Sequence, residues 1–307
     1  MNEKLSVFLD TDIGSDVDDV GAIALMHELS KYTGIPIIGM THCTSSPYGV
    51  GCMDVLNRLY DMPNIPIGIL KKPGFMDGSN GIRNHIYSQY LTEHWPNRVA
   101  DGQDIPDARD VLRDVLAAQP DHSVILVTIG FFTNLAMFVS QPEDLALVER
   151  KVHHLVSMAG CFVDDPSNKE IPRVEWNVLM DVPSAQAVMN VWPTPIDFAP
   201  FETGLPIITG VNWHGITEDN PLRKAYAIHS PNGRNSWDLT AVWSAMMPIH
   251  PWFTWKTGTV TMAPDGQTML SEEPDGMHRV LALAEYPAKI AEMLDEWMAG
   301  ARGEDTV

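Results

Sequence analysis

The sequence has few cysteines and no long apolar run, and each shortage excludes a class of protein. Only Cys43, Cys52 and Cys161 occur among the 307 residues, and no two have CxxC spacing. Neither a disulfide framework nor a zinc ribbon is therefore indicated. No stretch has the apolar length that a signal peptide or a membrane helix needs. We expect reduced thiols and a cytoplasmic protein without a membrane partner.

Basic residues are scarce relative to acidic ones. The chain has 20 Lys and Arg against 40 Asp and Glu, and its formal net charge is -20. A surface this negative repels phosphate backbones and anionic lipid, so polymeric nucleic acid and membranes are poor partners. Small neutral substrates and divalent cations fit better, although acidity alone also keeps an ordinary protein soluble. Hydrophobic residues make up 45% of the chain, which is enough for a sizeable core.

Short apolar runs alternate with helical patterns, and this predicts βαβ units and a mainly parallel sheet. Strands are expected at 5–10, 36–42, 65–70, 123–129, 153–158 and 194–200, and helices at 18–32, 49–60, 106–118, 133–149 and 183–191. An apolar helix after 237, a β-rich region around 257–283 and a helix near 285–299 follow. The predicted fold class is α/β, as a single domain over 1–307 whose mainly parallel central sheet carries helices on both faces.

Two segments, 71–105 and 202–235, contain proline and glycine and have an irregular pattern. We expect them to be long loops or lids. Ligands of such sheets sit beyond the carboxyl ends of the strands, so polar residues at those ends are the candidates for a site.

An acidic cluster follows the first predicted strand directly, and it consists of Asp10, Asp12, Asp16, Asp18 and Asp19. Carboxylates this close repel one another unless a cation neutralises them. Oxygen ligands without His or Cys favour calcium or magnesium over zinc. Helix capping explains only one or two of the five. An EF-hand does not fit, because its glycine and glutamate positions are not matched.

Two interpretations of the acidic cluster remain open on the residues alone. A magnesium-dependent phosphatase that forms an aspartyl-phosphate also carries Asp-x-Asp after its first strand, and Asp10 would be its nucleophile. A calcium-dependent ribose-binding protein without catalysis would use the same acidic residues.

The acidic run resembles the N-terminal signature of the nucleoside hydrolase family, Asp-x-Asp-Pro-Gly-x-Asp-Asp. Ile13 stands in place of the proline, and the loop is two residues longer before the final pair. The added Asp16 leaves open which of Asp16, Asp18 and Asp19 binds the metal. The resemblance implies that Asp12 is both the general base and a calcium ligand, and that Asp19 is a second calcium ligand. It also implies that Asp18 binds the ribose hydroxyls and that Asp10 supports the metal site.

Three later segments resemble the family in the same order along the chain. The carbonyl of Ile129 matches the one that completes the calcium shell, and Asp238 matches the last calcium ligand. The segment Glu175-Trp176-Asn177, followed by Asp181, resembles the stretch that binds the sugar. Further sugar-binding candidates that the resemblance implies are Asn168 and, after the second strand, Ser46.

The leaving group is expected to meet Trp237. Pyrimidine-cleaving members carry His before the last calcium ligand, whereas Trp is similar to the purine-specific members. An indole stacked on a purine favours protonation of the base, because the aromatic face stabilises a cationic ring. The plain structural interpretation is that Trp237 is a core aromatic residue at the start of a helix. Weaker candidates for contact with the base are His85, Glu202, His229 and Arg234.

The resemblance as a whole implies calcium-dependent hydrolysis of the N-glycosidic bond of a purine-like ribonucleoside, which yields ribose and free base. The partner is a small-molecule nucleoside. Members of the family are often dimers or tetramers, which makes a homo-oligomer a possible assembly.

Overall fold

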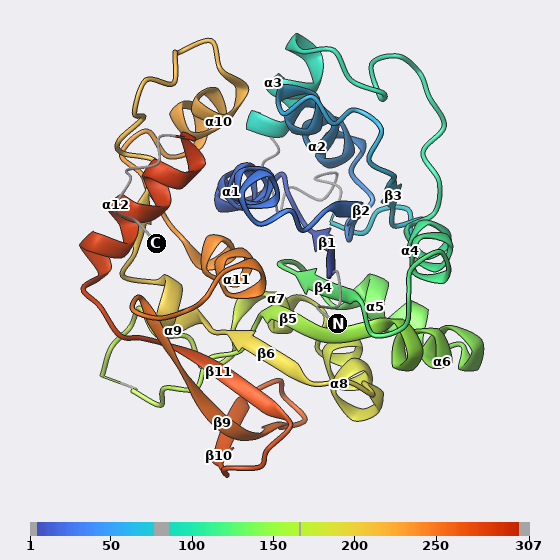
Figure 1. Cartoon of the computed structure of the whole chain (residues 1–307), viewed down its shortest axis with the longest axis vertical. Coiled ribbons are helices and arrows are strands. Elements are labelled where there is room, and N and C mark those ends of the chain that lie inside the picture. The colour runs from blue at the N-terminus through green and yellow to red at the C-terminus, as the bar shows by residue number, and fades with distance from the viewer. Residues whose placement is uncertain (1–4, 77–85, 166, 301–307) are drawn as a thin grey trace.

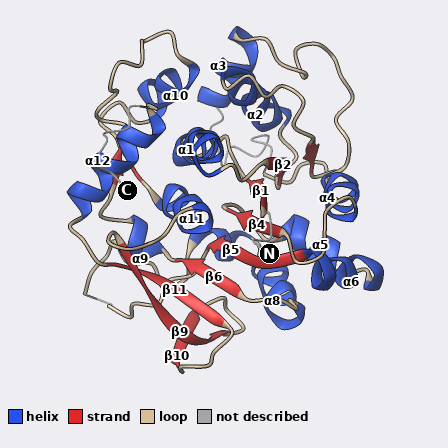
Figure 2. Ribbon diagram, viewed as in Figure 1, coloured by secondary structure: helices blue, strands red, loops and turns tan. Residues whose placement is uncertain are grey.

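The chain is described by a computed structural model that covers residues 5–76, 86–165 and 167–300. One nine-stranded sheet crosses it, in the order β10-β9-β11-β6-β5-β4-β1-β2-β3 (Figures 1 and 2). All neighbours from β11 to β3 pair in parallel, whereas β9 is antiparallel to both β10 and β11. The predicted fold class is confirmed. The extent of the single domain, 1–307, stays a prediction.

The strands of this sheet follow the apolar runs closely. They are β1 (Ser6–Thr11), β2 (Ile37–His42), β3 (Ile67–Ile69), β4 (Val124–Thr128), β5 (Val152–Met158), β6 (Ile196–Ala199), β9 (Phe253–Met262), β10 (Thr268–Glu272) and β11 (His278–Leu283). A separate two-stranded sheet pairs β7 (Ile208–Thr209) with β8 (Arg234–Asn235).

Helices cover both faces of the large sheet (Figure 1). On one face lie α4 (Ala108–Ala117), α5 (Thr133–Val139), α6 (Pro142–Lys151) and α8 (Val182–Val191). On the other lie α1 (Asp18–Thr33) and α11 (Trp237–Met246). The remaining helices are α2 (Pro47–Leu59), α3 (Ile86–His94), α7 (Trp176–Met180), α9 (Phe201–Gly204), α10 (Pro221–His229) and α12 (Pro287–Met298).

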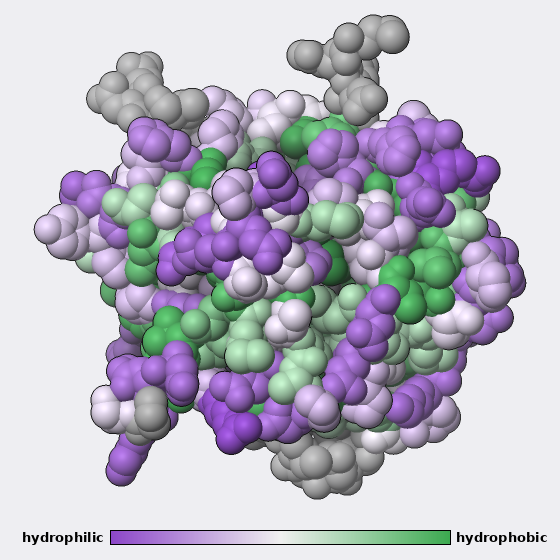
Figure 3. Space-filling view, turned by 90° about the horizontal axis from the view of Figure 1, so that it is seen from below, coloured by the Kyte–Doolittle hydropathy of each residue, from purple (hydrophilic) through white to green (hydrophobic). Residues whose placement is uncertain are grey.

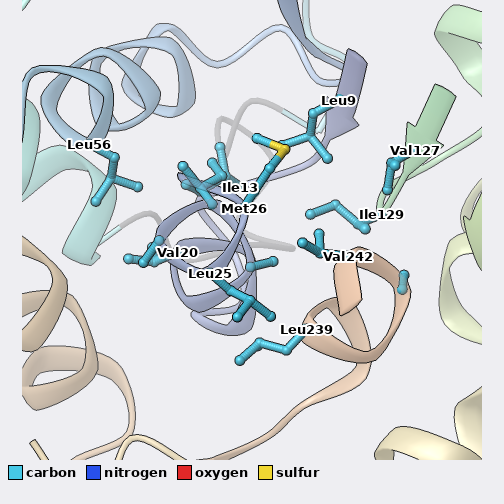
Figure 4. Packing of buried hydrophobic residues seen from close by; sticks show 14 of the residues in the cluster. Leu9, Ile13, Val20, Leu25, Met26, Leu56, Val127, Ile129, Leu239 and Val242 are labelled. Carbon is cyan, nitrogen blue, oxygen red and sulfur yellow. The ribbon is translucent and has the colours of Figure 1, made fainter. Parts of the chain in front are cut away.

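The central strand β1 is buried on both of its faces. Val7 and Leu9 belong to one hydrophobic cluster and Phe8 to the other, and all three side chains are fully buried. Successive strand side chains point to opposite faces, so a strand covered on both sides reads as a continuous apolar run. Figure 4 shows the first cluster, in which Leu25 of α1 lies beside Leu239 of α11. This packing holds the starts of α1 and α11 next to the end of β1.

The predictions of long loops at 71–105 and 202–235 and of one helix at 133–149 are wrong in part. The two segments contain α3, α9, α10 and the small sheet. These helices are short, so their apolar pattern is brief, and Pro221 begins α10 rather than breaking it. The third segment is two helices, because Pro142 starts a new one after Val139.

No helix among the described residues is long and apolar enough to cross a membrane. Hydrophilic and hydrophobic residues are interspersed on the face shown in Figure 3.

Candidate active site

A cavity of about 400 Å³ opens at the carboxyl ends of β1, β4 and β5, beside the start of α11. This is the position at which parallel sheets bind their ligands. The residues that line it are Asp12, Ser15, Asp16, Asp18, Asp19, Ile129, Met158, Glu175, Trp176, Asn177, Phe201, Arg234, Trp237 and Asp238. Segments from the beginning, middle and end of the chain therefore meet in one wall.

The loop between β1 and α1 is anchored from a distant helix. Gly14 has φ 135°, a conformation that glycine adopts without strain. Its N–H donates to the Tyr87 hydroxyl of α3 at 2.8 Å, and the same hydroxyl donates to the carbonyl of Asp16. Sequence reasoning missed Tyr87, because the two residues lie 73 positions apart and nothing local links them.

Three buried carboxylates form a tight group at the start of α1 and α11. One ligand oxygen each from Asp18, Asp19 and Asp238 lies within 4.8 Å of the others. Burial raises the pKa of each well above its usual value, and the charges of the neighbouring aspartates raise it further. Carboxylates held this close are stable as anions only beside a cation. The oxygen-only set fits a hard divalent ion such as calcium.

Asp18 also joins two helices. Its Oδ2 accepts hydrogen bonds from the backbone N–H groups of Trp237 at 3.1 Å and Asp238 at 3.2 Å. A carboxylate is favourable there, because the first N–H groups of a helix lack partners inside it. The residue expected to bind ribose hydroxyls therefore also fixes the start of α11.

Asp12 lies in the cavity wall against a residue that has to be glycine. A Cβ atom on Gly130 would come within 2.6 Å of both the Asp12 nitrogen and the Cys43 sulfur. Close approach of the ends of β1 and β4 depends on this glycine. Ile129, whose carbonyl is an expected metal ligand, lines the same wall and accepts a hydrogen bond from the Asn177 amide at 3.3 Å.

The predicted sugar-binding segment forms another side of the cavity. The Glu175 carboxylate caps α7, accepting from the N–H groups of Asn177 at 2.7 Å, Val178 at 3.2 Å and Gly160 at 3.3 Å. Burial nevertheless raises the pKa of Glu175 to about 7, because the desolvation cost outweighs these three bonds. Trp176 lines the cavity with 43% of its surface exposed.

Aromatic and charged groups meet at the end of the cavity beside Trp237. The indole stacks on Phe201 with ring centres 5.2 Å apart, and its Nε1 donates to the Phe201 carbonyl at 2.8 Å. The guanidinium of Arg234 lies over the indole, 4.9 Å from the ring centre. Two bonds join Arg234 to Asp16, from Nε to Oδ1 at 2.8 Å and from Nη2 to Oδ2 at 2.5 Å.

Asp10 lies beneath the cavity rather than in its wall. It is fully buried, and its carboxylate accepts from the Thr41 hydroxyl at 2.6 Å and the Asn134 amide at 2.7 Å. Burial raises the pKa of Asp10 to about 7. A nucleophile has to reach its substrate, so this position does not favour the phosphatase alternative.

Other sequence-predicted residues among those described do not line the cavity. Ser46 is buried at the start of α2, and exposed Asn168 accepts a bond from the Glu170 N–H at 3.0 Å within its own loop. Glu202 accepts from the Phe162 N–H at 3.1 Å. His229 donates from Nε2 to the Ser15 carbonyl at 3.0 Å and so supports the cavity loop. His85 lies outside the described residues.

Some cavity residues that sequence reasoning missed carried a usable signal. Met158 ends β5 and Phe201 follows the end of β6, so the rule about strand ends points to both. Thr11 lies inside the acidic run but does not line the cavity, and its hydroxyl donates to the Asp19 carboxylate at 2.5 Å.

Comparisons with known proteins identify the family and the fold of the chain. The family model described as inosine-uridine preferring nucleoside hydrolase matches residues 7–285. The fold is similar to that of the inosine-uridine preferring nucleoside hydrolase from Bacillus anthracis, with a TM-score of 0.68 and 16% identity over 97% of this chain and 100% of that one. No curated protein matches the sequence.

Two further solved structures share the fold. One is the purine-preferring ribonucleoside hydrolase from Gardnerella vaginalis, with a TM-score of 0.66 and 18% identity over 96% of this chain and 99% of that one. The other is the type III effector protein XopQ complexed with adenosine diphosphate ribose, with a TM-score of 0.74 and 14% identity over 98% of this chain and 95% of that one.

Proposed function

The chain belongs to the inosine-uridine preferring nucleoside hydrolase family and is therefore an N-glycosyl hydrolase, and we propose that it cleaves a purine-like ribonucleoside with calcium as its metal. The observation that carries the proposal is the tight group of buried carboxylates, Asp18, Asp19 and Asp238, in the wall of a cavity of about 400 Å³. Such a volume suits a ligand of nucleoside size, since small-molecule pockets are typically about 300–1,000 Å³.

The metal would be held by carboxylates and one carbonyl. Asp12, Asp19, Asp238 and the carbonyl of Ile129 are the proposed ligands, and all four residues line the cavity. Asp18 lies close enough to Asp19 and Asp238 to share this role. When bound, calcium supplies a fixed positive centre that orients a water molecule and the sugar hydroxyls.

The chemical step uses Asp12 as its base. Asp12 accepts a proton from water while the water oxygen bonds to C1′ of the ribose. The bond from C1′ to the base nitrogen breaks, and its electron pair leaves with the base. The sugar gains positive charge in this step, and the carboxylates around it stabilise that charge.

The remaining wall residues are proposed to orient the substrate. Asp18, Glu175, Trp176 and Asn177 face the sugar in this proposal, and Trp237 contacts the departing base. The preference for a purine rests on Trp237, because a tryptophan at this position is similar to the purine-specific members of the family.

A panel of nucleosides tests the proposal. Protein stripped of metal by a chelator is incubated with purine and pyrimidine ribonucleosides, with and without added calcium, and reducing sugar is measured. We expect ribose from the purine nucleosides only after calcium is restored. Equal release in the presence of the chelator, or no release from any nucleoside, would contradict the proposal.

The same panel separates the alternatives. Inorganic phosphate released from nucleotides with magnesium, without glycosidic cleavage, would favour the phosphatase. Ribose binding without product after long incubation would favour the non-catalytic protein. A cytoplasmic location and a homo-oligomeric assembly stay predictions.

A further inference from the structure

The cavity wall holds six carboxylates but, among the described residues that line it, one basic side chain, Arg234. A positive charge would disfavour the cationic sugar of the proposed reaction, so its position in the cavity matters. It lies at the end beside Trp237 rather than within the tight carboxylate group.

Arg234 is held rigidly by three contacts. Its strand, β8, pairs with β7 through Thr209. The Asp16 carboxylate accepts hydrogen bonds from the Nε–H group and from one hydrogen of Nη2. The guanidinium lies over the Trp237 indole, 4.9 Å from the ring centre. This side-on pair with Asp16 does not use the hydrogens of Nη1 or the second hydrogen of Nη2.

The partner carboxylate belongs to the two extra residues of the acidic loop. Two hydrogen bonds fix this insertion, because Tyr87 donates to the carbonyl of Asp16 and His229 donates to the carbonyl of Ser15. The insertion is thereby anchored to α3 and α10, and it presents Asp16 to Arg234 in one orientation.

The guanidinium of Arg234 can stabilise the departing base. The base leaves with the electron pair of the broken bond, and hydrogen-bond donors with positive charge stabilise such a group. A guanidinium keeps its proton at any working pH, so it acts as a fixed charge and donor rather than as an acid. The Trp237 ring already contacts the Phe201 ring and the Arg234 guanidinium. A base that stacked on the indole would therefore lie next to both groups.

We propose that Arg234, oriented by Asp16, stabilises the negative charge of the leaving base and favours bases with adjacent acceptor atoms on one edge. The inference rests on the proposed function. Water bonds to C1′, Asp12 takes its proton, and the pair from the broken C–N bond goes to the base. The base bonds to the unused guanidinium hydrogens and then takes a proton from solvent water.

Two substrates test this role. One is inosine, a purine nucleoside whose base leaves poorly. The other is para-nitrophenyl β-D-ribofuranoside, whose leaving group is stable as an anion without help. In Arg234→Met we expect kcat for inosine to fall by about 10²–10³-fold, whereas kcat for the nitrophenyl riboside changes by less than about fivefold.

Matched variants separate charge from architecture. Arg234→Lys keeps the positive charge but loses the planar guanidinium with its several N–H donors. Asp16→Asn removes the negative charge that orients the guanidinium. Both variants should lower kcat for inosine by a smaller factor than Arg234→Met, and should leave kcat for the nitrophenyl riboside nearly unchanged. Arg223→Met is the control, because Arg223 lies on α10 in the same segment, 3.5 Å from Glu218, and not in the cavity wall. We expect it to change neither rate.

The outcomes are distinct. A loss confined to inosine supports the role. Equal losses on both substrates would make the ion pair purely structural and overturn the inference, as would unchanged rates on both. An unaltered chain that cleaves neither compound would instead overturn the proposed function, and this inference with it.

Discussion

At the scale of single residues, the cavity holds carboxyl groups where burial opposes their charge. Asp18, Asp19 and Asp238 are nearly fully buried, and their oxygens lie within 4.8 Å of one another. One of them, Asp19, accepts a bond from the Thr11 hydroxyl, which offsets only part of the cost. Buried carboxylates that lower the stability of the fold are typical of functional sites. A bound divalent ion would make the same carboxylates stabilising.

Asp12→Asn should abolish most turnover. The amide cannot accept the proton of the attacking water, so we expect kcat for a purine nucleoside to fall by about 10²–10⁴-fold. Steady-state rates of ribose release measure the effect. Asp121→Asn is the control, because this surface carboxylate lies 2.7 Å from Lys151 and does not line the cavity. Turnover that survives Asp12→Asn intact would remove the residue from the role of base.

Single residues differed in how well the sequence predicted them. Asp12, Asp18 and Asp19 share one local run, and all three line the cavity with Asp238. The pairing of Asp16 with Arg234 spans 218 positions, so no local pattern indicates it. Asn168 and Ser46 were predicted from the family resemblance alone, and neither lines the cavity. Their predicted sugar contacts remain untested.

At the scale of elements, two helices begin at the cavity and share a residue. α1 begins at Asp18, and the Asp18 carboxylate accepts the first N–H groups of α11. α3 contributes from the other side, where the Tyr87 hydroxyl bonds both Gly14 and Asp16 of the acidic loop. The loop is therefore positioned in part by α3, which contributes no residue to the cavity wall.

Tyr87→Phe should loosen this loop. The change leaves the Gly14 N–H and the Asp16 carbonyl without their partner, which we expect to lower the free energy of unfolding by about 1–3 kcal/mol. A displaced loop should also raise KM for the nucleoside. Urea unfolding and steady-state kinetics measure the two effects. Tyr90→Phe is the matched control on α3, since the Tyr90 ring stacks on His94. Equal results for both variants would show that the Tyr87 hydroxyl does not hold the loop.

Elements with a long apolar pattern were predicted well, and short ones were not. The six expected strands all appear within two residues of their predicted bounds. α3 and α10 are nine residues each and α9 is four, too short for a helical period to stand out. They were read as loops, although Tyr87 of α3 is needed to anchor the acidic loop.

At the scale of the whole molecule, the order of the strands decides where the acidic loop lies. β1 lies between β4 and β2, so its end faces the segments that follow β4 and β5. The alternation of strands and helices predicted the fold class. It did not predict the strand order or the antiparallel β9 and β10, because these depend on pairings between distant segments.

Calcium should stabilise the chain more as the pH rises. Burial raises the folded pKa of Asp18, Asp19 and Asp238 above the unfolded value of 3.8, and that of Asp10, beneath the cavity, to about 7. Between the unfolded pKa of 3.8 and the raised folded pKa values, the folded metal-free protein binds more protons than the unfolded chain. The stability of the metal-free protein therefore falls as the pH rises through this range. Calcium binds the ionised carboxylates, and its stabilisation should approach about 2.7 kcal/mol at a hundredfold excess over Kd.

Thermal unfolding from pH 5 to pH 8 with chelator or with calcium measures this difference. We expect the gain in Tm from calcium to increase steadily with pH. The variant Asp19→Asn with Asp238→Asn should lose that gain. A gain that is constant with pH, or that survives in the double variant, would place the ion elsewhere.

Metal binding and turnover measured side by side test the proposed chemistry most directly. Metal-free chain is titrated with calcium by calorimetry, and ribose release from inosine is followed over the same concentrations. We predict that release is absent at first and rises with occupancy until about one ion is bound per chain. Ribose release at full rate before any calcium binds would contradict the proposed role of the acidic cluster.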